Sequence, residues 1–86
     1  MKKDDIQFNL TEEMTDYIIE INDLKKQLIE LEEKIIIIKN EEEKIIIKNE
    51  IEDITTQIEK YKRCFIKSFQ KCNKEQIKLY LKLEKD

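Results

Sequence analysis

Cys64 and Cys72 are the most reactive side chains in the sequence, so their spacing is the first test for metal or redox chemistry. A zinc site needs three or four ligands, and the chain has no histidine to complete one. Eight residues of one helix rise by ~12 Å, which exceeds the ~7 Å Cα limit for a disulfide. We therefore expect no metal, no other cofactor and two free thiols that pack as small hydrophobic residues beside an apolar stripe.

A run of three glutamates, Glu41 to Glu43, is the other candidate ligand cluster. Calcium sites with oxygen ligands usually need a shaped loop that contains glycine, and the sequence has none. Paired carboxylates that act as acid and base need a cleft, which two packed helices do not offer. Without histidine the chain also lacks the base of a catalytic triad. We predict no catalytic residue, no small-molecule substrate and no enzymatic activity.

Two apolar stripes with helical spacing organise the rest of the chain. The first stripe follows a strict 4-3 pattern, and the second begins in the same way and drifts to a spacing nearer 3.6. Ile18 and Ile29 widen the first stripe, which is typical of bundles of three or more helices. We predict that both stripes form a helix–helix interface, which comprises Met14, Tyr17, Ile21, Leu24, Leu28, Leu31, Ile35 and Ile38 in the first and Ile47, Ile51, Ile54, Ile58, Tyr61, Phe65 and Phe69 in the second.

A polar segment, residues 39–44, separates the stripes and shifts their phase. The nine residues from Ile38 to Ile47 turn a helix by ~900°, so a continuous helix would carry the stripes on opposite faces. The sequence therefore predicts an all-α helical hairpin, or antiparallel coiled coil, that is completed by oligomerisation. Its helices are expected at 11–38 and 45–84. Two alternatives stay open, namely one long continuous helix in an antiparallel coiled coil and a short β-hairpin in the Ile-rich middle.

The N-terminal segment 1–10 is predicted to be a short extended tail. Its apolar residues Ile6, Phe8 and Leu10 alternate with polar ones, but this strand-like period covers only five residues. These three residues are candidates for docking on a partner, for example as an added strand. Thr11 can cap the helix that follows, because its hydroxyl can accept a hydrogen bond from the first turn.

Charge is divided unequally along the chain. Residues 1–43 hold 6 basic and 13 acidic side chains, whereas residues 44–86 hold 11 basic and 7 acidic ones. In a hairpin, the acidic first helix lies against the basic end of the second. The segment 60–82 interleaves eight basic residues with aromatic ones, so a membrane surface or a nucleic acid is an alternative partner for it.

The size and composition of the chain bear on its role and its location. An 86-residue chain with two stripes is too small to bury a core alone, so we expect a protein partner, either a second copy or a different chain. No signal peptide or transmembrane segment is evident. We predict a soluble protein of a reducing intracellular compartment, the cytoplasm or nucleus. Abundant Ile, Lys and Asn, with no Ala or Val, suggest an AT-rich genome.

These observations together predict a non-enzymatic structural protein. We expect a small coiled-coil subunit that scaffolds or stabilises a larger multiprotein assembly through helix–helix packing. A peripheral membrane or nucleic-acid adaptor that uses the basic aromatic helix 60–82 is the alternative function.

Overall fold

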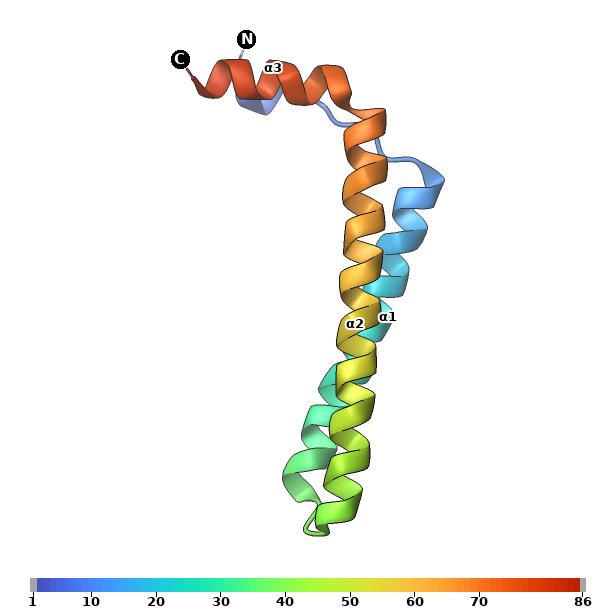
Figure 1. Ribbon diagram of the computed structural model, residues 1–86. Helices are drawn as coiled ribbons and strands as arrows, with labels where there is room; N and C mark the ends of the chain where they lie inside the picture. The colour runs from blue at the N-terminus through green and yellow to red at the C-terminus, as the bar shows by residue number, and fades with distance from the viewer. Residues whose placement is uncertain (1, 86) are drawn as a thin grey trace.

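The chain folds into a helical hairpin with a bent C-terminal end. The computed structural model describes residues 2–85, in which a short 3₁₀ turn, η1 (Lys3–Asp5), precedes helices α1 (Glu12–Ile37), α2 (Glu41–Cys72) and α3 (Lys74–Glu84). Helices α1 and α2 lie side by side and antiparallel, and α3 turns away from the end of α2 to give an L-shaped outline (Figure 1). This part of the chain contains no strand and no single long helix, so neither alternative fold describes it.

Helix α1 begins as the sequence predicted. Thr11 is extended, and its Oγ1 accepts a hydrogen bond from the backbone N–H of Met14 at 3.2 Å. Glu12 and Glu13 place negative charge on the first turn, where the helix macrodipole favours it. Thr11 is therefore the N-cap of α1.

The connection between α1 and α2 is shorter than predicted, because only residues 38–40 lie outside the helices and most of the expected connection 39–44 is helical. Asn40 begins α2, since its Oδ1 accepts a hydrogen bond from the N–H of Glu42 at 2.9 Å. Good helix formers and the N-terminal glutamates then favour helix over loop. Within residues 2–85 no residue has a positive φ, so the turn forms without the glycine that this chain lacks.

The predicted second helix, 45–84, is interrupted at Asn73, which separates α2 from α3. Asn73 has φ −121° and ψ 28° and is completely buried. Its side-chain Nδ2 donates a hydrogen bond to the carbonyl oxygen of Phe69, one turn earlier, at 3.0 Å. An asparagine side chain that competes for backbone groups in this way disfavours a regular helix, so the chain bends here.

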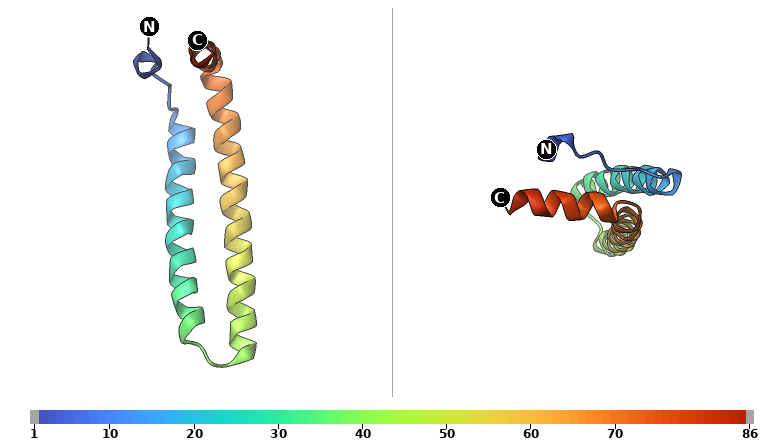
Figure 2. Two further views of the ribbon diagram at one scale, coloured as in Figure 1. Left: turned by 90° about the vertical axis from the view of Figure 1, so that its left-hand side faces the viewer. Right: turned by 90° about the horizontal axis from the view of Figure 1, so that it is seen from above.

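The hydrophobic core is thin and elongated. Among residues 2–85 the buried apolar side chains are Ile6, Met14, Leu24, Ile47 and Ile58. The Cα radius of gyration is 18.6 Å, against about 12 Å for a compact domain of this length. The hairpin forms one long layer of two helices, and the N-terminal segment lies beside α3 (Figure 2). Much of the apolar surface therefore has no cover within the chain.

Candidate functional site

The two predicted stripes line the seam between α1 and α2. Every residue of both stripes is buried or half-buried, and the apolar side chains with the largest exposed fractions lie outside the stripes. Near the open end of the hairpin, the rings of Tyr17 and Tyr61 lie 6.1 Å apart. The seam residues are those that the sequence assigned to the helix–helix interface. Their contact with a partner stays a prediction.

The N-terminal tail runs beside α3, and η1 contacts this helix (Figure 2). The ring of Phe8 lies 5.1 Å from that of Phe69 and 6.2 Å from that of Tyr80, and Ile6 is buried. Leu10 is 59% exposed and takes no part in this packing. Two of the three candidate docking residues thus pack against their own chain. Met1 of the predicted tail lies outside the described residues.

Asn73 holds the tail in place, a role that the sequence did not reveal. The backbone N–H of Asn9 donates a hydrogen bond to Asn73 Oδ1, and Asn73 Nδ2 donates to the carbonyl oxygen of Asn9 at 2.9 Å. The amide therefore satisfies both backbone groups of one tail residue. At the far end, Lys3 Nζ lies 3.8 Å from Glu84 Oε1 and 5.2 Å from the ring centre of Tyr80. These contacts fix the tail along α3.

An apolar groove, which we call the corner groove, runs from the α1–α2 seam into the angle between α2 and α3. It consists of two hollows of about 320 and 330 Å³ that share Phe65 and Ile66. Ile66 is 51% exposed and Leu81 is 50% exposed, so the groove is open to the surface. Its walls include Phe8 of the tail, Ile18 and Ile21 of α1, Phe69 of α2, and Ile77 and Leu81 of α3.

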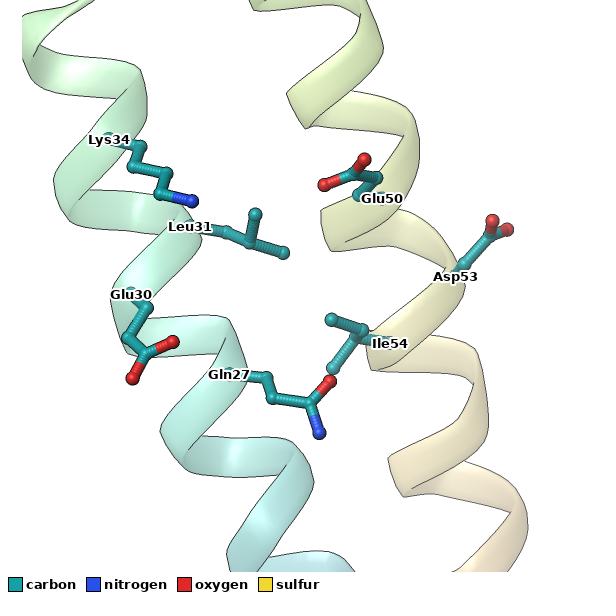
Figure 3. A pocket seen from close by; sticks show the side chains of 7 residues that line it. All are labelled: Gln27, Glu30, Leu31, Lys34, Glu50, Asp53 and Ile54. Carbon is teal, nitrogen blue, oxygen red and sulfur yellow. The ribbon is translucent and has the colours of Figure 1, made fainter.

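A third hollow, of about 340 Å³, lies nearer the helix connection and has a different chemistry (Figure 3). Leu31 and Ile54 lie between the two helices, and three carboxylates and one lysine surround them (Figure 3). The charged side chains are Glu30, Lys34, Glu50 and Asp53, and all four residues are exposed. Water reaches these carboxylates, so the hollow is an acidic surface groove and not a dry catalytic cleft.

A row of cations lies on the outer face of α2. Lys60, Arg63, Lys67 and Lys71 recur at helical spacing, and all four are exposed. Lys60, Arg63, Lys67 and Lys71 each follow a seam residue by two positions, and the seam residues are Ile58, Tyr61, Phe65 and Phe69. Two residues rotate a helix by ~200°, so these cations are turned away from α1. These four cations therefore face away from the aromatic rings of Tyr61, Phe65 and Phe69, whereas Lys62 lies beside Phe65 in the corner groove.

The cysteines differ in exposure. Cys64 is half-buried, whereas Cys72 is exposed, so the expectation that both pack as small hydrophobic residues is wrong for Cys72. Within residues 2–85 no group of three or more cysteine, aspartate or glutamate side chains is arranged to hold a metal ion.

Tyr17 carries the one pKa shift that the structure explains. Its hydroxyl donates a hydrogen bond to Glu13 Oε1 at 2.7 Å, one turn earlier on α1. This bond, helped by partial desolvation and the negative charge of Glu13, raises the pKa of Tyr17 to about 12. The pair stabilises the neutral phenol at the open end of the seam.

Comparison of the chain with protein-family models, curated proteins and solved structures found no match. None of the described helices is both long enough and apolar enough to cross a membrane. Inference about function therefore depends on the surfaces of the chain itself, above all on its uncovered apolar area.

Proposed function

We propose that this chain is a non-enzymatic coiled-coil subunit that stabilises a larger intracellular protein assembly through helix–helix packing. The exposed area of the chain carries the proposal. The chain exposes 7132 Å², whereas a compact monomer of 10.5 kDa exposes about 5,400 Å². The excess, about 1,700 Å² on one chain, is roughly twice the ~800 Å² that each partner buries in a stable interface of standard size.

The exposed isoleucines at the closed end of the hairpin support the same proposal. Ile36 and Ile37 at the end of α1 are 82% and 77% exposed, and Ile45 and Ile46 at the start of α2 are 57% and 58% exposed. Single exposed apolar residues are common, but a cluster on one end of a small domain marks an interaction surface. Burial of these side chains by a partner would stabilise the folded hairpin.

The free thiols support the proposed compartment. The two cysteines are separate, at a half-buried and an exposed position, and form no disulfide. Exposed thiols persist where the cell keeps them reduced, as in the cytoplasm or nucleus.

The proposal is tested by the dependence of mass and stability on concentration. We expect sedimentation to show a mass above 10.5 kDa, or helicity that appears only when a partner is added. For a self-assembling chain, the thermal midpoint in circular dichroism should fall on dilution, because association stabilises the folded state by mass action. A monomer that melts cooperatively at the same temperature over a ~hundredfold dilution contradicts the proposal.

A second candidate function uses the outer face of α2. Lys60, Arg63, Lys67 and Lys71 form no ion pair among the described salt bridges, so they offer a row of four positive charges to an anionic surface. Membranes and nucleic acids both attract such a row. A peripheral membrane or nucleic-acid adaptor would bind through these charges, and its affinity would fall steeply with salt.

A further inference from the structure

Building on the proposed assembly role, we infer that the corner groove binds an amphipathic helix of a partner protein. The residues on either side of the apolar face of that helix are acidic. The groove has the form that such helices occupy, with two adjoining hollows and an open apolar floor. Helices that bind in grooves insert anchors at positions i, i+3 or i+4 and i+7. Phe65 and Phe69, one turn apart on α2, both line the groove, and their ring centres lie 6.1 Å apart.

The charge of the groove selects an acidic partner. Lys25 of α1 and Lys62 of α2 are its charged lining residues, and both are exposed. Lys62 lies 3.8 Å from Glu59, but both side chains are about half exposed, so this ion pair is weak and leaves the charge available. The third hollow, with three carboxylates, repels the same helix (Figure 3). Charge thus directs an acidic helix to the corner groove.

A second copy of the chain fits the groove less well. In a two-fold dimer through this surface, Lys25 and Lys62 of one copy would approach the same lysines of the other. The acidic outer face of α1 could instead enter the groove of the next copy, but such a head-to-tail contact is satisfied in every copy only in a closed ring or an open filament. A different protein with an acidic amphipathic helix can fill the groove without bringing lysines together and without head-to-tail association.

The groove exists before the partner binds. Phe8 forms one of its walls, and Asn73 fixes the neighbouring residue Asn9 through two hydrogen bonds. A preformed groove lowers the entropy cost of binding, because the tail is already ordered. The partner therefore meets a rigid corner made of α2, α3 and the tail.

The test uses a labelled probe peptide and the full chain. The probe is a helix of roughly five turns with leucine at i, i+4 and i+7, glutamate on both flanks and alanine elsewhere. Fluorescence anisotropy should show saturable binding, and exchange of the flanking glutamates for lysine should weaken it by roughly tenfold. Ile66→Glu should weaken binding of the glutamate probe by at least about tenfold, because it places a charge on the groove floor.

Ile19→Glu is the matched control, because Ile19 is 52% exposed on α1, close to the 51% of Ile66, and does not line the groove. We expect this variant to bind the probe as the unchanged chain does. Leu81→Glu, on the α3 wall, replaces Ile66→Glu if circular dichroism shows that the latter has lost helicity.

Several results would overturn the inference. The inference fails if the unchanged chain and Ile66→Glu bind the glutamate-flanked probe with equal affinity. It also fails if the unchanged chain binds the glutamate-flanked and lysine-flanked peptides with equal affinity. A dimer that Ile66→Glu converts to a monomer would show that a second copy fills the groove instead. A chain that self-associates but ignores the probe contradicts this inference and leaves the assembly proposal intact. A stable monomer that ignores the probe contradicts both.

Discussion

At the scale of single residues, Asn73 has the largest effect on the shape of the molecule. Its side chain donates to two carbonyl oxygens, those of Phe69 and Asn9, and accepts from one N–H. A buried amide with this many partners is costly to alter, because each group that loses its partner keeps its desolvation cost. The same amide interrupts the helix and holds the tail.

Asn73→Asp tests this double role. Aspartate has the same shape, but an oxygen replaces the Nδ2 donor and faces the carbonyl oxygens of Asn9 and Phe69. We expect a loss of about 1–3 kcal/mol in unfolding free energy and faster proteolysis of the tail. Asn49→Asp, on the exposed face of α2, is the control and should change little. If both variants keep the tail equally protected, Asn73 does not hold it.

The raised pKa of Tyr17 predicts that the stability of the fold depends on pH at the alkaline end. Because its pKa is raised from 10.0 to about 12, the hydrogen bond to Glu13 stabilises the fold fully below pH 10. That contribution disappears as the pH rises from 10 through 12. An ultraviolet titration should show one tyrosine ionising at about 12, and Tyr17→Phe should remove that step. A titration without such a late step would contradict the assigned hydrogen bond.

At the scale of elements, the starts of the two long helices, α1 and α2, depend on side-chain caps. The chain has no glycine or proline, yet α1 and α2 are joined by three residues, 38–40. Thr11 and Asn40 each accept a backbone hydrogen bond in the first turn of a helix. The caps thus decide where the long apolar and charged runs become helix.

Asn40→Ala tests the cap of α2. Loss of the hydrogen bond from Glu42 should cost about 0.5–2 kcal/mol, measured by thermal or chemical denaturation. The control is Asn49→Ala within α2, where alanine is the better helix former and stability should stay equal or rise slightly. If Asn40→Ala left the free energy of unfolding unchanged, α2 would begin at this point without help from its cap.

Leu24→Glu tests the seam between the two long helices. Leu24 is 7% exposed, so a glutamate there would be buried without a partner, at a cost of about 3–5 kcal/mol. Circular dichroism should show loss of the folded hairpin, whereas Ile19→Glu on the outer face of the same helix should keep it. A stable Leu24→Glu hairpin would contradict the packing described for the seam.

At the scale of the whole molecule, the chain carries three separate surfaces. The corner groove is apolar with lysines at its edge, the third hollow is acidic, and the outer face of α2 carries the row of cations. This separation permits contacts with more than one neighbour in an assembly. It also distinguishes the assembly proposal from the membrane alternative.

Liposome co-sedimentation tests that alternative. A membrane-bound helix must insert its aromatic rings, but Tyr61, Phe65 and Phe69 are half-buried against the rest of the chain. We therefore expect no pelleting with anionic or neutral vesicles while helicity is retained. Pelleting with anionic vesicles alone, reversed by salt, would favour the adaptor function.

The sequence determined the parts of the fold that depend on neighbouring residues. The 4-3 spacing from Met14 to Ile38 identified the seam face of α1, and Thr11 identified its first turn. The phase shift between the stripes indicated that the chain folds back. It did not show that α2 begins at Glu41, because a polar run can form either a loop or a capped helix.

Only the tertiary structure decided the bend, the docked tail and the corner groove. Asn9 and Asn73 are 64 residues apart in the chain, and their hydrogen bonds bring the tail to α3. Helical periodicity describes how a residue relates to its neighbours within a few turns and carries no information about such a pair. Nothing in the sequence therefore indicated that Ile66 and Leu81 lie in one groove. They line one groove because the chain bends between them, at a buried asparagine whose partner is the distant tail.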